Sequence, residues 1–187
     1  MRLFLALELD ASAQSAIVVS TAALRTQAPD LAWTAEHKLH LTLRFLGEQP
    51  GDAAQRIPPA MDDVASAHGA FPMRIRHVGA FPNFRRARVV WMGVEPEPRL
   101  ELLHHDVELA CDRLGFGVEG RPFRPHVTIA RVRGNTDAGA LRPLARLAKR
   151  VDLEREVMVE RIDLMQSIPG RAGASYQRLH GAALRSA

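Results

Sequence analysis

Two short stretches of the chain place a threonine two residues after a histidine. The first pairs His40 with Thr42, and the second pairs His126 with Thr128. The apolar residues between and after them indicate β-strands, in which alternate side chains share a face. Each stretch therefore offers an imidazole and a hydroxyl side by side on a polar face. A single pair of this kind is most often structural, so the repetition is the informative feature.

Two such strands can place an imidazole on either side of one substrate group. Displacement at a phosphodiester needs a base that takes a proton from water and an acid that protonates the leaving oxygen. Histidine serves both roles because its ordinary pKa of about 6.5 keeps both forms available near neutrality. The hydroxyls of Thr42 and Thr128 can donate hydrogen bonds to the non-bridging oxygens. Ring strain in a cyclic 2′,3′-phosphate makes a metal ion less necessary.

Other site chemistries fit the sequence less well. Neither motif has a nearby carboxylate or cysteine to complete a metal site, and His104 and His105 diverge by about 100° on a helix. The one cysteine, Cys111, falls on the apolar stripe of a helix, and the sequence has no G-x-S-x-G elbow and no Gly-rich phosphate loop. The isolated histidines, expected to be surface or structural groups, are His37, His68, His77 and His180.

Periodicity predicts the elements that hold the two motifs. One helix, 12–28, has Ser12 as its expected N-cap, and another, 52–68, is expected either to kink at Pro58 and Pro59 or to begin there. Further helices are predicted at 98–114 and 137–149. Strands are predicted at 2–9, 39–46, 71–79, 87–95, 126–132, 155–166 and around 176–181.

The predicted elements repeat. His40 and His126 are 86 positions apart, and a shift of that size carries the first strand, both helices and the following strand onto elements of the second part. We therefore expect residues 1–187 to form a single domain of two pseudo-symmetric, interleaved lobes. Motif strands near the pseudo-two-fold axis would bring both histidines to one central cleft.

Composition limits the partners and the setting. The net charge of +4 favours polyanionic partners, although an arginine-rich composition can also reflect a GC-rich genome. No apolar run approaches the roughly 20 residues of a membrane span. A single cysteine fits the reducing cytoplasm, and nothing in the sequence demands more than a monomer. The local basic clusters are Arg74, Arg76, Arg85, Arg86 and Arg88, and then Arg121, Arg124, Arg131 and Arg133.

The two motifs in context resemble a known family. H-L-T-L-R-F-L-G-E at 40–48 and R-P-F-R-P-H-V-T-I-A-R at 121–131 are similar to the paired HxTx motifs of the two-histidine (2H) phosphoesterases, and most similar to the bacterial RNA 2′,3′-cyclic phosphodiesterases, also called 2′-5′ RNA ligases. The opening R-L-F-L-A-L, G-A-F-P at 79–82, V-V-W-M-G-V at 89–94, and L-M-Q-S followed by Tyr176 fit as well. The resemblance spans nearly the whole chain.

The resemblance implies a bilobal α+β fold in which two antiparallel sheets flank a cleft and helices lie outside. It implies no metal and no other cofactor, and an RNA substrate, such as a tRNA fragment or an oligonucleotide, whose 2′,3′-cyclic end is hydrolysed to a 2′-phosphomonoester. By position, His40 would be the proton donor and His126 the acceptor, with the roles reversed in 2′-5′ ligation.

Three further residues are candidates for the site. Arg131 follows the second motif and is a candidate phosphate ligand, but strict alternation puts it on the face opposite His126, so it needs a twist or bulge to reach the cleft. Tyr176 and Phe45 are candidates for stacking on a base. Alternation gives Phe45 the parity of the core, which favours core packing for that residue.

Two other functions remain open. The same chemistry could act on a small cyclic nucleotide or an ADP-ribose cyclic phosphate, and turnover of an oligonucleotide against a mononucleotide separates these substrates. A non-catalytic RNA-binding module would use the arginine clusters instead. It predicts salt-sensitive binding without turnover and without dependence on the two histidines.

Overall fold

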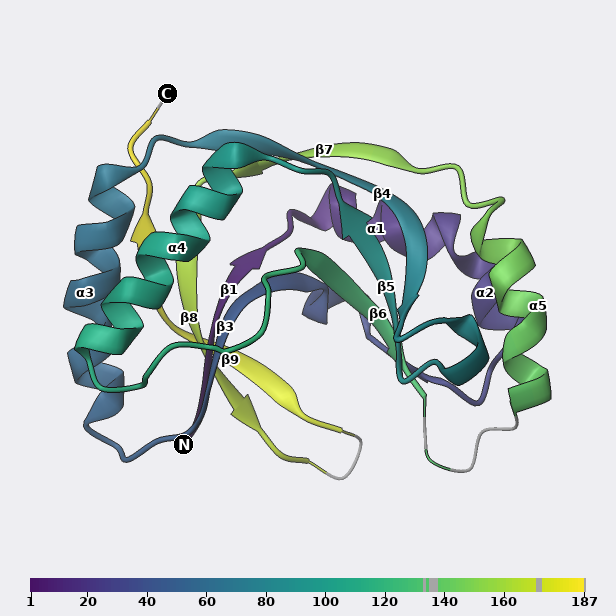
Figure 1. Ribbon diagram of the computed structural model, residues 1–187, viewed down its shortest axis with the longest axis horizontal. Helices are drawn as coiled ribbons and strands as arrows, with labels where there is room; N and C mark the ends of the chain where they lie inside the picture. Colours follow the sequence, from purple (N-terminus) through teal and green to yellow (C-terminus); the bar gives the residue numbers. More distant parts are fainter. Residues whose placement is uncertain (133, 135–137, 171–172, 187) are drawn as a thin grey trace.

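The computed structural model of the chain describes residues 1–132, 134, 138–170 and 173–186 (Figure 1). The helices are α1 (Ala11–Ser20), α2 (Ala22–Gln27), α3 (Ala53–Ala67), α4 (Pro98–Arg113) and α5 (Ala138–Ala148), with short 3-10 turns η1 (Glu36–Lys38) and η2 (Phe84–Arg86). The strands are β1 (Arg2–Glu8), β2 (Ala32–Trp33), β3 (His40–Glu48), β4 (Phe71–Phe81), β5 (Val89–Val94), β6 (His126–Arg131), β7 (Glu154–Val159), β8 (Arg161–Ile168) and β9 (Ser175–Ala183).

The strands form one antiparallel sheet in the order β7-β4-β5-β6-β3-β1-β8-β9, and β2 adds to β6. The predicted α+β class, with antiparallel pairing and helices outside, is confirmed. The two sheets expected from the sequence are joined, because β3 and β6 pair at Leu41 and Val127. We call β3, β1, β8 and β9 the β3 half, and β6, β5, β4 and β7 the β6 half.

Helices cover one face of each half. In Figure 1, α3 and α4 lie at one end of the molecule and α2 and α5 at the other. Helix α3 packs on β8 and β9 and α4 packs on β3, whereas α5 packs on β4 and α1 on β7. Helix α1 therefore follows a strand of the β3 half but covers the β6 half. Both halves thus draw on segments from distant parts of the chain.

The first strand shows how the two faces of the sheet differ. Leu3, Leu5 and Leu7 are buried in the main core under the helices, whereas Phe4 and Ala6 belong to a separate small cluster on the other face. Burial of each leucine contributes about 1.5–3 kcal/mol relative to an exposed position. The face opposite the helices also carries His40, and we call it the site face.

The helices differ from prediction in their ends and interruptions. The expected helix 12–28 is two helices, α1 and α2, separated at Thr21, whose hydroxyl donates a 2.7 Å hydrogen bond to the carbonyl oxygen of Ile17. Its N-cap is Asp10 rather than Ser12, since the Asp10 carboxylate accepts from the backbone N–H of Ala13 at 2.8 Å. Helix α3 contains both of its prolines, so it does not begin at them.

The expected strand 155–166 is two strands. Strands β7 and β8 are separated by Glu160 and lie in different halves, β7 beside β4 and β8 beside β1. The buried apolar residues change parity at the break, from Val157 and Val159 in β7 to Ile162 and Leu164 in β8, a signal that the prediction of one strand overlooked. At Glu160 the chain crosses from one edge of the sheet to the other half.

Candidate active site

His40 stands at the start of β3 on the site face. Its Nδ1 lies 2.7 Å from the carbonyl oxygen of Lys38, and its Nε2 lies 3.2 Å from the hydroxyl of Thr42. A carbonyl oxygen can only accept, so Nδ1 carries a hydrogen and donates it. The other nitrogen, Nε2, is left to exchange a proton with a substrate. The strand thus fixes the ring, its tautomer and the neighbouring hydroxyl together.

His126 repeats this arrangement at the start of β6. Its Nδ1 lies 2.6 Å from the carbonyl oxygen of Arg124, which again leaves Nε2 for proton exchange. The antiparallel pairing of Leu41 with Val127 sets the two motifs head to tail on neighbouring strands. The two predicted histidines are therefore brought together at the junction of the halves.

A bulge in β3 changes the parity of the residues that follow Thr42. Arg44 pairs with Leu5 and Thr42 with Ala6, so Leu43 is an extra residue. Leu43 and Arg44 are consequently both buried, and Phe45 is turned out of the core with 56% of its surface exposed. The expectation of core packing for Phe45 was wrong, because strict alternation cannot anticipate the extra residue. Its ring lies 6.1 Å from that of Phe4 on the site face.

A matching bulge occurs in β6. Val90 pairs with Ala130 and Trp91 with Thr128, which leaves Ile129 as the extra residue. Ile129 and Ala130 are both buried, and Arg131 is exposed. The bulge that Arg131 requires to reach the face of His126 is therefore present.

Aromatic rings enclose each imidazole on the site face. Tyr176 contacts the His40 ring edge-on at 5.4 Å between centroids, and Phe4 lies 5.1 Å from the same ring. On the other half, Phe81 meets the His126 ring edge-on at 5.0 Å, with Trp91 at 6.4 Å. Such contacts hold the imidazoles in place and remove water from them.

Three of these aromatic residues were not recognised in the sequence as site residues: Phe4, Phe81 and Trp91. Alternation in β1 does put Phe4 on the face opposite the core leucines, which is a usable signal. The indole ring of Trp91 packs directly on Gly79, where an added Cβ would overlap the ring. This close approach explains the glycine of the G-A-F-P stretch.

Burial lowers the pKa of both histidines. For His40, desolvation is the largest effect, and the Lys38 carbonyl and the Glu8 carboxylate act against it, while Arg131 and His126 lower the pKa further. For His126, desolvation again lowers the pKa most, the Arg124 carbonyl raises it and Arg131 lowers it. Arg131 therefore disfavours the protonated form of both rings. A bound phosphate anion would favour the protonated forms.

Three of the remaining histidines, His37, His77 and His105, are exposed, and the others and the cysteine have structural partners or surroundings. His68 and His180 bond the carboxylates of Asp106 and Asp62, and His104 stacks on Phe123. Burial raises the pKa of the Cys111 thiol to about 11, so it stays protonated and unreactive. Within the part of the chain that the structure describes, no group of three His, Cys, Asp or Glu residues could hold a metal ion. None of the described helices is long and apolar enough to cross a membrane.

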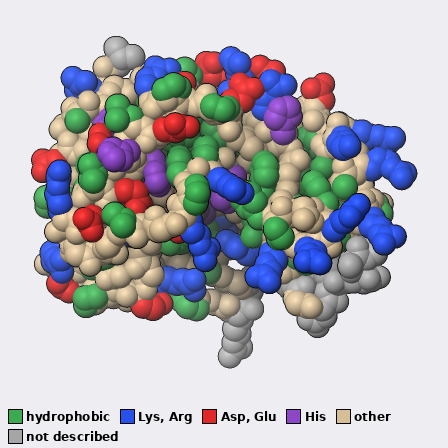
Figure 2. All heavy atoms as spheres, in the orientation of Figure 1, with side chains coloured by type: hydrophobic (Ala, Val, Ile, Leu, Met, Phe, Trp, Pro, Cys, Tyr) green, Lys and Arg blue, Asp and Glu red, His purple; other side chains and the backbone are tan. Residues whose placement is uncertain are grey.

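The basic clusters divide into paired and unpaired arginines. Arg74 and Arg76 form ion pairs with Glu95. Figure 2 shows the Lys and Arg side chains gathered over the β6 half, while most acidic side chains of this face lie over the β3 half and along the upper edge. Arg133 lies outside the described residues. The exposed arginines without an ion pair to any described carboxylate include Arg85, Arg86, Arg88, Arg121 and Arg124.

Several known proteins are similar to this chain in sequence. RNA 2′,3′-cyclic phosphodiesterases are 36% identical over 146 residues in Aeropyrum pernix (78% of this chain, 81% of that protein) and 29% identical over 176 residues in Methanothermobacter thermautotrophicus (94% and 95%). One from Geobacillus stearothermophilus is 36% identical over 128 residues, 68% of this chain but 41% of that longer protein.

Solved structures agree with these relatives. The crystal structure of TT0787 of Thermus thermophilus superposes with a TM-score of 0.82 at 28% identity, covering 100% of this chain and 99% of that one. E. coli LigT complexed with 3′-AMP gives 0.71 at 26% identity, covering 98% and 97%. The family model of the 2′-5′ RNA ligase superfamily matches residues 13–171. The resemblance carried by the two motifs is thereby confirmed, and the chain belongs to the 2′-5′ RNA ligase superfamily.

Proposed function

We propose that this protein hydrolyses the 2′,3′-cyclic phosphodiester ends of RNA to 2′-phosphomonoesters, with His40 and His126 as acid and base. One observation carries the proposal: two imidazoles, each held through Nδ1 by the carbonyl two residues earlier, meet on adjoining strands with Nε2 available. The relatives named RNA 2′,3′-cyclic phosphodiesterases support the same activity.

The reaction uses both imidazoles in one step. Nε2 of His126 takes a proton from water as the water oxygen bonds to phosphorus. The bond from phosphorus to O3′ breaks on the opposite side, and O3′ takes its proton from Nε2 of His40. The product carries a 2′-phosphate and a free 3′-hydroxyl, and solvent restores both histidines. Reversible 2′-5′ ligation is the accompanying side activity, with the two roles exchanged.

Other residues hold the phosphate as its charge grows. The hydroxyls of Thr42 and Thr128 point from the same strand face as the histidines and donate to the non-bridging oxygens. Arg131, brought to this face by the β6 bulge, adds a cation. The strand geometry fixes the backbone positions of these donors before substrate binds, which reduces the rearrangement needed during the reaction.

The RNA contacts two different surfaces. Tyr176 and Phe45, 38% and 56% exposed, are available to stack on the terminal base beside His40. The unpaired arginines of the β6 half suit the phosphates of the preceding nucleotides (Figure 2). The protein is proposed to act as a monomer in the cytoplasm, where its buried free Cys111 thiol stays reduced.

Product analysis tests the activity and the substrate together. The protein is incubated, with EDTA present, with an oligonucleotide that ends in a 2′,3′-cyclic phosphate, and phosphorus NMR locates the product phosphate. We expect a 2′-phosphate, and faster turnover of the oligonucleotide than of a cyclic mononucleotide. A 3′-phosphate would contradict the assigned bond cleavage, and binding without turnover by the folded protein would contradict catalysis.

A further inference from the structure

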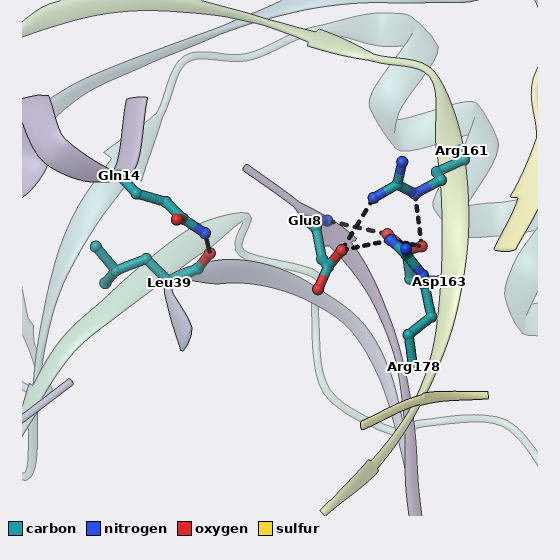
Figure 3. Close-up of polar contacts among 6 residues, drawn as sticks. All are labelled: Glu8, Gln14, Leu39, Arg161, Asp163 and Arg178. Carbon is teal, nitrogen blue, oxygen red and sulfur yellow. Dashed lines mark hydrogen bonds and ion pairs between the residues drawn. The ribbon is translucent and has the colours of Figure 1, made fainter. Parts of the chain in front are cut away.

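An ion-pair network on the site face joins Glu8 and Asp163 to two arginines, Arg161 and Arg178 (Figure 3). The Glu8 carboxylate accepts hydrogen bonds from Arg161 at 2.9 Å and Arg178 at 2.7 Å. Arg161 also donates to Asp163 at 2.7 Å, and the backbone N–H of Glu8 donates to the other oxygen of Asp163 at 3.3 Å. Two arginines therefore fix the Glu8 carboxylate in one position instead of leaving it free in solvent.

The register of the sheet puts this carboxylate next to one histidine. Glu8 on β1 is the direct cross-strand partner of His40 on β3, and such partners share a face with Cβ atoms about 4.5–5.5 Å apart. In the β6 half the residue in the equivalent place, opposite His126, is Gly93. The glycine brings no charge. The two imidazoles thus differ in what faces them, although each is held in the same way through Nδ1.

The proposed reaction needs this difference, because one histidine must hold the proton while the other must be free of it. We infer that Glu8 is a positioning residue for the reaction proposed above: held by Arg161 and Arg178 as the cross-strand partner of His40, it places the transferable proton on His40 and leaves His126 as the base.

The other charged groups around His40 either disfavour its protonated form or are bonded to another group. Arg131 and His126, both on β6, lower the pKa of His40, whereas Glu8 raises it. The Lys38 ammonium bonds the carbonyl of Ala174, 2.7 Å away. Tyr176 on β9 presents a ring edge.

The two arginines and Asp163 also serve the fold, and this role has to be separated from the one inferred. Asp163 is fully buried, so it needs cationic partners, and Glu8 balances the charge of the second arginine. A purely structural Glu8 would affect stability without changing which histidine is protonated. Titration of the individual imidazoles separates the two roles, since it reports protonation residue by residue and needs no turnover.

The test is an NMR titration of His40 and His126 in the intact protein without substrate. In Glu8→Gln the amide oxygen can still accept from the arginines but the negative charge is gone. We expect the pKa of His40 to fall by about half a unit to one unit, with a smaller change at His126. In Arg178→Gln, Glu8 is less neutralised, so the pKa of His40 rises instead.

The matched control is Glu95→Gln. Glu95 likewise pairs with two arginines, Arg74 and Arg76, but does not face either site histidine, so neither imidazole pKa should move. If the pKa of His40 stays the same in both Glu8→Gln and Arg178→Gln, the inference is wrong. The opposite signs keep the test decisive if only one of these variants folds.

Turnover then distinguishes this inference from the proposed function. With the cyclic-phosphate oligonucleotide, the alkaline limb of kcat/KM should move to lower pH in Glu8→Gln, because the acid loses its proton earlier. If the variants show the expected NMR shifts but the wild-type protein does not turn over the substrate, the proposed function is refuted and the placement of the proton still holds. Normal turnover with an unmoved alkaline limb would refute the role of Glu8 alone.

Discussion

The β3 half and the β6 half contain the same β-bulge in their motif strands, but the bulge presents a different type of side chain in each half. Each motif strand carries a bulge three residues after its histidine, at Leu43 in one and Ile129 in the other. Each bulge returns the residue five positions after the histidine to the site face. That residue is Phe45 in the β3 half and Arg131 in the β6 half, so one half offers an aromatic surface and the other a cation. Equivalent backbone geometry does not imply equivalent chemistry.

The strands behind the motifs differ in the same way. Trp91 lies over Gly79 in the β6 half, and in the equivalent pair of the β3 half Ala6 faces Asp163. The large residue is on the inner strand in one half and on the outer strand in the other. The β3 half gains a buried carboxylate with its arginines, and the β6 half gains a ring against His126. The halves are therefore related in topology and specialised in side chains.

The largest effect is expected from replacing the histidine that each half contributes to the site. His40→Ala and His126→Ala should each lower kcat by about 10²–10⁴-fold, because each removes one proton transfer. The double variant should be little slower than either single variant, since the two groups act in one step. Single-turnover rates on the cyclic-phosphate oligonucleotide measure this, with exposed His105→Ala as the control. Near-normal turnover in either single variant would contradict the mechanism.

The second prediction compares the two residues that the bulges return to the site face, Arg131 and Phe45. Arg131→Gln should lower kcat by about 10²-fold or more through loss of a cation at the phosphate. The pKa of both histidines should rise, because Arg131 lowers both, so the acid limb of the pH profile moves to higher pH. Phe45→Leu, the matched change in the other half, should mainly raise KM. Equal losses of kcat in the two variants would mean that the halves are not specialised as described.

A third change tests the packing of Trp91. Gly79→Ala places a methyl group against the indole ring, so we expect a loss of about 1–3 kcal/mol in the free energy of unfolding. Urea denaturation measures it, with Gly51→Ala, where the added atom meets nothing within 4 Å, as the control. Unchanged stability would show that Trp91 can move away freely.

The smallest effect concerns the arginine surface. The double change Arg85→Gln and Arg86→Gln should raise KM for an oligonucleotide a few-fold. It should also reduce the slope of log KM against log salt, by about one for each phosphate that the protein no longer binds. A cyclic mononucleotide should be unaffected. The control is Arg74→Gln, which alters an arginine that already has acidic partners. Equal effects on KM for the oligonucleotide and the mononucleotide would show that RNA does not bind to this surface.

The sequence predicted the elements better than their exact faces. The histidine–threonine pairs are visible because a two-residue spacing has one meaning in a strand. Phe45 was assigned to the core because alternation was extended past Leu43, and a single extra residue reverses the parity of all that follow. In β6 the extra residue Ile129 changes the parity in the same way, and this change puts Arg131 on the face of His126. A bulge is defined by the register between two paired strands, and the sequence of one strand does not determine that register.

Contributions from across the sheet could not be predicted in the same way. Phe4, Glu8 and Trp91 reach the histidines only through cross-strand register, which joins residues far apart in the chain. The division of 155–166 into β7 and β8 was missed for another reason, since the change of apolar parity between Val159 and Ile162 is visible in the sequence and was overlooked. Local periodicity determines what a segment is, and tertiary pairing determines which neighbour it meets.

The crossing at Glu160 has a consequence for how the chain folds. During synthesis, β1 and β3 emerge first, but their outer neighbours β8 and β9 emerge last. The edge of β1 therefore stays unpaired until β8 has left the ribosome, about 150 residues after β1, and such long-range pairing slows folding. We expect neither half to be stable as a separate fragment, because a cut anywhere between β3 and β8 divides the strands of one sheet between two pieces.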